Sequence, residues 1–153
     1  MLETASRTQL ATEPATKGKI LLVDEDSSDL QLYTWALEQQ GHFVDGCATY
    51  HEGAERLERG PYDLIILSQR GRAFEGHFLL ERAIELDRHR PVLVMTRSVD
   101  MRSYLDAMYR GAHDYLEKPP APWEITRTVS SCLSRRMPSL ERSSLPPGHC
   151  APL

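Results

Sequence analysis

Three runs of four consecutive apolar residues constrain the fold of this chain more than any other feature of its sequence. They are Ile20-Leu21-Leu22-Val23, Leu64-Ile65-Ile66-Leu67 and Val92-Leu93-Val94-Met95. A strand with one face in water alternates apolar and polar residues, whereas a strand buried on both faces is apolar throughout. The three runs therefore predict central strands of a parallel sheet that is covered on both sides.

Weaker strands are predicted at residues 43–47 and 115–116, and amphipathic stretches with helical spacing separate the five strands. Residues 26–29 form a cluster of capping side chains that begins the first of these helices. Thr49, with Glu52 three residues later, forms a capping box for the second helix. Five strands that alternate with five helices predict an α/β fold with a doubly wound parallel sheet.

The 153 residues of the chain are the usual length of one globular domain. We predict that this domain covers residues 18–136, because the apolar pattern lies within these limits. Residues 1–17 carry few large apolar side chains, which predicts a disordered leader. Residues 137–153 are rich in proline and predict a disordered tail.

Charge and cysteine usage argue against several classes of partner. The 18 basic and 22 acidic residues give a formal net charge of −4, which does not favour nucleic acid or a membrane surface. No apolar run approaches the ~20 residues that a membrane span requires. The three cysteines show no paired spacing, which is typical of a reducing compartment. We therefore expect a cytoplasmic protein that binds neither nucleic acid nor membranes.

Polar side chains cluster where the predicted strands end, which is the edge at which doubly wound sheets bind ligands. Asp24, Glu25 and Asp26 directly follow the first apolar run. Helix capping explains one of these acids but not all three, and adjacent carboxylates are typical ligands of Mg²⁺. Thr96 and Lys118 lie at the ends of the fourth and fifth predicted strands. Their hydroxyl and ammonium groups add an anion-binding pair beside a cation-binding one.

Four sequence motifs occur in order along the chain. They are Ile20-Leu21-Leu22-Val23-Asp24-Glu25-Asp26, Tyr62-Asp63-Leu64-Ile65-Ile66-Leu67, Pro91-Val92-Leu93-Val94-Met95-Thr96 and Gly111-Ala112-His113-Asp114-Tyr115-Leu116-Glu117-Lys118-Pro119. Over residues 19–134 the chain resembles the CheY-like receiver domain of response regulators. The resemblance implies a flavodoxin-like sheet with strand order 2-1-3-4-5. It also implies a role in two-component, phosphorelay signal transduction.

The resemblance implies roles for individual residues. Asp24 and Glu25 resemble the acids that bind Mg²⁺ in the family. Thr96 and Lys118 resemble the hydroxyl and the ammonium that contact the phosphoryl oxygens. Tyr115 resembles the aromatic switch that swings inward when the threonine is drawn to the phosphate.

The third strand departs from the family pattern at its end. In the family an aspartate stands there and takes a phosphoryl group from a phosphohistidine, whereas this chain has Ser68. A serine cannot form an acyl phosphate, and no histidine is placed by a motif to activate its hydroxyl. We therefore expect a pseudo-receiver that has no phosphoacceptor, is not an enzyme and requires no cofactor. Mg²⁺ would bind Asp24 and Glu25 only weakly, because a third carboxylate is missing.

Arginines near the predicted pocket allow two interpretations. Arg70 and Arg97 are either solvated surface residues or contacts for an anion or for the loops of the pocket. A sharper hypothesis is that Arg97 or Lys118 pairs with Asp24 and Glu25. An internal ion pair would then replace the metal and hold the pocket in one state.

The main functional hypothesis is a stand-alone receiver that binds a partner protein without being phosphorylated. In the family, the fourth helix, fifth strand and fifth helix form a face that contacts partners or a second copy. Here that face would carry Met101, Tyr104, Tyr109, Tyr115 and Trp123, unless these side chains pack in the core. The partner would be a histidine kinase, an output protein or, in a homodimer, the chain itself.

Two alternatives remain open from the sequence. A ligand-gated module would bind a small anion or a nucleotide near Arg70, Arg97 and Lys118, although the chain has no glycine-rich phosphate loop. A catalytic module would use Ser68 as a nucleophile, although the sequence indicates neither a base nor an oxyanion site.

Overall fold

The structure, a computed structural model, describes residues 17–69, 76–97, 99–118 and 121–135. The predicted leader, except for Lys17, and the predicted tail lie outside the described residues. Arg70, one of the candidate anion contacts, lies outside them as well.

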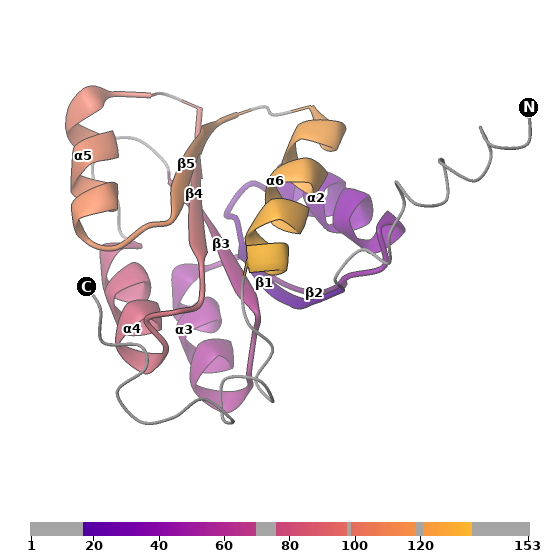
Figure 1. The fold of residues 1–153 in the computed structure, drawn as a ribbon, viewed down its shortest axis with the longest axis horizontal. Coiled ribbons are helices and arrows are strands. Elements are labelled where there is room, and N and C mark those ends of the chain that lie inside the picture. The colour runs from indigo at the N-terminus through magenta and orange to yellow at the C-terminus, as the bar shows by residue number, and fades with distance from the viewer. Residues whose placement is uncertain (1–16, 70–75, 98, 119–120, 136–153) are drawn as a thin grey trace, which may run out of the picture.

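Strands and helices alternate along the described residues, five of each (Figure 1). The strands are β1 (Lys19–Val23), β2 (Phe43–Cys47), β3 (Leu64–Gln69), β4 (Val92–Thr96) and β5 (Asp114–Glu117). The helices are α2 (Ser27–Gln39), α3 (Tyr50–Arg59), α4 (His77–Leu86), α5 (Met101–Tyr109) and α6 (Pro122–Arg135).

The five strands form one parallel sheet in the order β2-β1-β3-β4-β5. This confirms the predicted doubly wound α/β fold and its strand order. The order reverses between β1 and β3, so the carboxyl ends of these two neighbouring strands lie at the switch point of the sheet. The fold therefore brings the ends of β1 and β3 together at the place where such sheets carry their sites.

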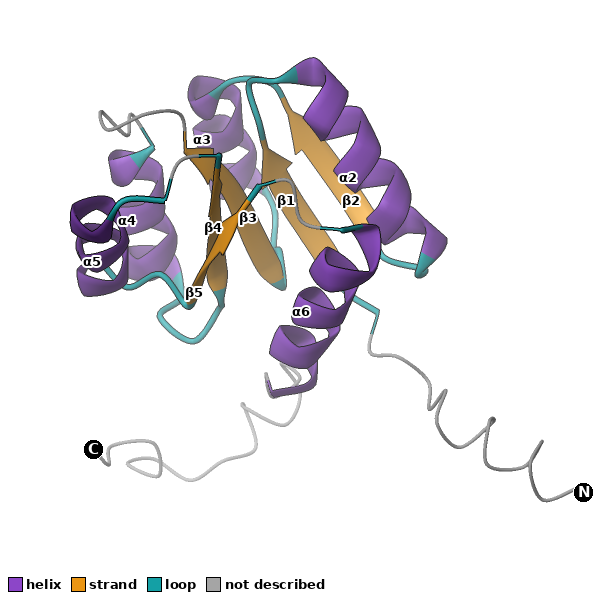
Figure 2. Ribbon diagram, turned by 90° about the horizontal axis from the view of Figure 1, so that it is seen from above, coloured by secondary structure: helices purple, strands orange, loops and turns teal. Residues whose placement is uncertain are grey.

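Helices cover both faces of the sheet (Figure 2). The side chains of α2 and α6 pack on one face, and those of α3, α4 and α5 pack on the other. The even-numbered apolar residues of β1 and β3 enter the core beneath α2 and α6, and the odd-numbered ones enter the opposite core. Both sides of these strands are thus buried, which explains why their sequences are apolar without interruption.

Side-chain caps fix where several helices begin. The carboxylate of Asp26 accepts hydrogen bonds from the backbone N–H groups of Ser28 and Asp29 at the start of α2. At α3, Thr49 Oγ1 accepts from the N–H of Glu52 at 3.0 Å, which is one of the two hydrogen bonds of the predicted capping box, while Glu52 Oε2 accepts from Arg56. These caps satisfy N–H groups that have no partner within the helix.

Within the part of the chain that the structure describes, no helix has the length and apolar character needed to cross a membrane.

Candidate functional site

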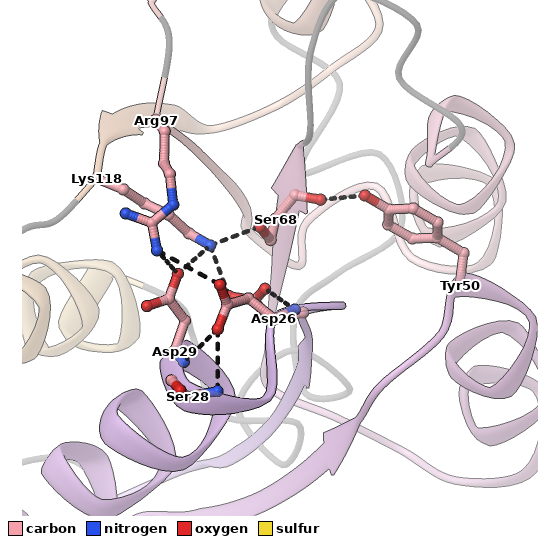
Figure 3. A network of polar contacts seen from close by, with 8 residues as sticks. Asp26, Ser28, Asp29, Tyr50, Ser68, Arg97 and Lys118 are labelled. Atoms are coloured by element: carbon pink, nitrogen blue, oxygen red, sulfur yellow. Dashed lines mark hydrogen bonds and ion pairs between the residues drawn. The ribbon is translucent and has the colours of Figure 1, made fainter.

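The ammonium group of Lys118 lies at the centre of a buried polar cluster at the carboxyl edge of the sheet (Figure 3). Nζ donates to Asp24 Oδ2 at 2.7 Å, to Asp29 Oδ2 at 2.9 Å and to Ser68 Oγ at 2.7 Å. The Lys118 side chain is only 3% exposed, so solvent screens these interactions little. An ammonium group has three N–H donors, and these three acceptors match them.

Each member of this Lys118 cluster comes from a different part of the fold. Asp24 directly follows β1, Asp29 lies in the first turn of α2, and Ser68 lies in β3. Lys118 follows the edge strand β5, and β4 separates that strand from β3. The cluster therefore ties the end of the edge strand to the centre of the sheet.

Asp24 uses both of its carboxylate oxygens within this cluster. Oδ1 accepts the backbone N–H of Asp26 at 2.9 Å, and Oδ2 accepts from Lys118. The residue is 1% exposed. A buried carboxylate is tolerated when it is paired and hydrogen-bonded, and both conditions are met here.

Asp29 belongs to the site, although its place in the sequence predicted only a capping residue. It is 8% exposed and accepts from Lys118 and from Arg97 Nη2, the latter at 2.6 Å. The available signal was its position in the helix. Asp29 lies four residues before Tyr33 and eight before Leu37, which are both buried, so it shares their face of α2.

Of the ion-pair hypothesis, the pairing of Lys118 with Asp24 is confirmed. Arg97 instead pairs with Asp29, and its Nη2 lies 3.7 Å from Asp26 Oδ2. The side chain of Arg97 is 56% exposed, so its ion pair is weaker than that of the buried lysine. Glu25 is exposed at the rim of the site.

Asp26 contributes a negative charge as well as the cap of α2. The hydrogen bond from the backbone N–H of Asp29 is the main cause that lowers the pKa of the Asp26 carboxyl. The N–H of Ser28 and the nearby charge of Arg97 act in the same direction. These interactions favour the ionised carboxylate that caps the helix.

Ser68 is held from two sides and is 1% exposed. Its hydroxyl oxygen accepts from Lys118, and its backbone carbonyl accepts from the Tyr50 hydroxyl at the start of α3 (Figure 3). A serine nucleophile requires a base that removes its proton. The Ser68 oxygen instead accepts from a cation, which draws electron density away from it.

Thr96 in β4 and Tyr115 in the neighbouring strand β5 contact each other through their side chains. Thr96 ends this strand and is fully buried, and its backbone carbonyl accepts the N–H of Lys118. The Tyr115 hydroxyl donates to Gln69 Oε1 at 3.1 Å. Burial raises the pKa of Tyr115, while a side-chain hydrogen bond with Thr96 acts in the opposite direction. Gln69 was not singled out by the sequence analysis.

The aromatic ring of Tyr33 lies next to the ammonium group of Lys118. Its ring centroid lies 5.9 Å from Lys118 Nζ, which is a cation–π distance. Burial, together with the negative charges of Asp29 and Asp24, raises the pKa of Tyr33 to about 12. Among the described residues its hydroxyl has no hydrogen-bond partner.

The arrangement fits a bound Mg²⁺ poorly. Both oxygens of Asp24 are engaged, and Ser68 supplies a hydroxyl instead of a carboxylate. The Lys118 ammonium, 2.7 Å from Asp24, would repel a second cation at the same oxygen. Within the described ranges, no three His, Cys, Asp or Glu side chains are grouped so that they could hold a metal ion.

Comparison with known proteins identifies the family. A model of the response regulator receiver domain matches residues 20–130. The chain therefore belongs to the family of response regulator receiver domains. The solved receiver domain protein (CheY-like) from Methanospirillum hungatei is similar in structure, with a TM-score of 0.73 and 26% sequence identity. That likeness covers 78% of this chain and 96% of the other.

Curated relatives are longer than this chain. It is 30% identical over 128 residues to the alginate biosynthesis transcriptional regulatory protein AlgB of Pseudomonas aeruginosa. The match covers 83% of this chain but 28% of AlgB. The transcriptional regulatory protein BasR of Escherichia coli is 30% identical over 117 residues, which cover 76% of this chain and 53% of BasR. The chain thus spans about a quarter to a half of these relatives.

Proposed function

We propose that this chain is a pseudo-receiver, a module that signals by binding a partner protein and does not itself accept a phosphoryl group. The observation that carries the proposal is the Lys118 cluster. The family resemblance assigns this lysine to phosphoryl oxygens, yet its three donors are matched by Asp24, Asp29 and Ser68. Ser68 stands at the position of the phosphoacceptor and offers no carboxylate that could become an acyl phosphate.

Exposed apolar side chains on α5 and on α6 support a protein partner. Met101 is 68% exposed, Tyr109 91% and Trp123 63%. Aromatic and methionine side chains are enriched at the centres of protein interfaces. Tyr104 and Tyr115, the other members of the expected face, contact each other edge to face. The proposed partner is a histidine kinase, an output protein or a second copy of the chain. The proposed place of binding is the cytoplasm.

The relatives suggest where such a module would act. AlgB and BasR are transcriptional regulatory proteins, and this chain corresponds to a part of each. By analogy, the module would transmit a signal within a two-component pathway through protein contacts. The proposal gives it no catalytic role and requires no bound cofactor, although weak binding of Mg²⁺ is compatible with it.

The anion-binding alternative has less support. Arg97 and Lys118, two of its three expected contacts, are paired with carboxylates. A cavity of about 540 Å³ lies between α4 and α5, lined by His77, Asp100, Arg102, Ser103 and Asp106. Two carboxylates in this lining disfavour an anionic ligand.

A phosphodonor assay tests the proposed function. The wild-type chain and the Ser68→Asp variant are incubated with acetyl phosphate and Mg²⁺, and bound phosphate is measured by phosphate-affinity electrophoresis. We expect no phosphate on the wild type and acid-labile, base-labile phosphate on Ser68→Asp, because the variant regains a carboxylate beside Lys118. The Ser68→Asn variant, of matching size but without a carboxylate, should stay unmodified. Phosphate on the wild-type chain would contradict the proposal.

A further inference from the structure

Gln69 links the end of β3 to the edge strand β5. It directly follows Ser68, and its side chain is buried, with 4% of the residue exposed. Its Oε1 accepts a hydrogen bond from the Tyr115 hydroxyl at 3.1 Å. Strand β4 lies between β3 and β5, so the Tyr115 ring must extend inward across β4 to make this contact.

Thr96 holds the same hydroxyl group from the intervening strand. Thr96 is the register partner of Gln69 in the β3–β4 pair and is fully buried. Its side chain is hydrogen-bonded to Tyr115. Two side chains from two strands therefore fix the phenol of Tyr115, and such chains of hydrogen bonds strengthen one another in a buried setting.

The ring of Tyr115 transmits this position to α5. It packs against the core beneath α3, α4 and α5. It also meets the ring of Tyr104 in an edge-to-face contact, with centroids 5.5 Å apart and an interplanar angle of 89°. Tyr104 belongs to α5, the helix that exposes Met101 and Tyr109. A change in the Tyr115 rotamer would remove a packing partner from this helix.

We propose that Gln69 is a positioning residue that holds Tyr115 inward in the resting chain. A side chain of β3, adjacent to the phosphoacceptor position, then sets the surface of α5 and β5 in place of a phosphoryl group. The inference rests on the proposed function and deepens it, because it names the residue that fixes the α5 and β5 part of the expected partner surface. It requires that the inward position of Tyr115 depend on the Gln69 acceptor and not on packing alone.

The test uses the full chain labelled with 3-fluorotyrosine and observed by ¹⁹F NMR without any phosphodonor. The Tyr115 and Tyr104 lines are assigned by their loss in Tyr115→Phe and Tyr104→Phe. In Gln69→Met, which keeps the side-chain length but lacks the acceptor, we expect the Tyr115 line to shift or split and the Tyr104 line to move. The separate variant Gln69→Glu keeps an acceptor oxygen and should show a single Tyr115 line near its wild-type position.

Matched variants make the result specific. Gln31→Met replaces an exposed glutamine of α2 and should leave both lines unchanged. Tyr115→Phe removes the donor and should move the Tyr104 line as Gln69→Met does, with no further shift in the double variant. The single variant Tyr115→Phe also tests the contact if Gln69→Met does not fold.

Unchanged Tyr115 and Tyr104 lines in Gln69→Met would overturn the inference, as would equal shifts in Gln31→Met. Phosphorylation of the wild-type chain would refute the proposed function but would not alter these spectra. The two failures are therefore distinguishable.

Discussion

At the scale of single residues, one ammonium group balances two buried carboxylates. Asp24 and Asp29 both form ion pairs with Lys118, and Arg97 supplies a second positive charge to Asp29 from the surface. The lysine reaches them from beyond the edge strand, so its side chain joins segments that lie 94 and 89 residues apart in sequence. Removing the Lys118 ammonium would leave the two carboxylates without their buried cation, and removing the carboxylates would leave the ammonium buried without an anion.

Lys118→Met should therefore destabilise the chain strongly. It keeps much of the aliphatic side chain but leaves Asp24 and Asp29 without the buried cation. Loss of one partner from a buried ion pair costs about 3–5 kcal/mol in the free energy of unfolding. Urea unfolding at neutral pH measures this, with Lys17→Met, at an exposed position, as the control that should change little. A loss below about 1 kcal/mol, the range of exposed pairs, would show that the cluster is not a buried ion pair.

At the scale of elements, the start of α2 shapes the site as well as the helix. Asp26 caps the helix and hydrogen-bonds the N–H of Asp29, and Asp29 in turn faces Lys118. The cap thereby fixes the first turn from which Asp29 reaches the cluster. A change at Asp26 should affect both the helix and the site.

Asp26→Ala should lower the free energy of unfolding by about 0.5–2 kcal/mol, the usual cost of losing a helix N-cap. Asp26→Asn retains a capping oxygen and should cost less. Because the pKa of Asp26 is lowered in the folded chain, its contribution is present above its ordinary pKa and is lost as pH falls through the folded value. The difference between wild type and Asp26→Ala, measured by urea unfolding, should accordingly shrink in acid. A difference that stays constant from neutral pH to acid would contradict this role.

Local signals predicted most of the elements, because the central strands are buried on both faces and the first helices carry recognisable caps. They also placed Asp24, Ser68 and Lys118 at one edge of the sheet, since strand ends converge there. The pairing of Arg97 with Asp29 was not predicted. It depends on how Arg97, which directly follows β4, is placed relative to the first turn of α2, and no periodicity within either segment records that. Gln69 was missed for a similar reason, because its partner Tyr115 lies 46 residues away across an intervening strand.

At the scale of the whole molecule, the amino ends of the strands provide a pH-sensitive contact. His42 is 4% exposed, and its Nδ1 accepts the N–H of Gly18, which immediately precedes β1. Its Nε2 is buried without a partner among the described residues. Burial is the main cause that lowers the pKa of His42, and the charge of Lys17 adds to it. The folded chain therefore favours the neutral imidazole.

The free energy of unfolding should consequently fall as pH decreases below about 6.5, the ordinary pKa of histidine. In this window the unfolded chain binds a proton that folded His42 does not, which costs up to about 1.4 kcal/mol per pH unit until the folded pKa is reached. Unfolding in urea at pH 7.5 and pH 5.5 measures the loss. It should be smaller in His42→Asn, whose side chain can still accept from Gly18.

His77 requires a separate control, because burial lowers its pKa as well. His77→Gln identifies its share of the same loss. If His42→Asn showed the full pH dependence of the wild-type chain, this account of His42 would be wrong.

The central claim is that the carboxyl edge of this receiver is closed to a phosphoryl group by its own lysine and serine. Titration of the wild-type chain with Mg²⁺ and beryllofluoride, a phosphoryl mimic, followed by amide NMR, tests it most directly. The account predicts that beryllofluoride adds no saturable shifts at Asp24, Thr96, Tyr115 or Lys118 to those that Mg²⁺ alone causes. A saturable response that spreads from Asp24 to β5 and α5 would contradict it, because a phosphoryl mimic would then occupy the site and move the partner face.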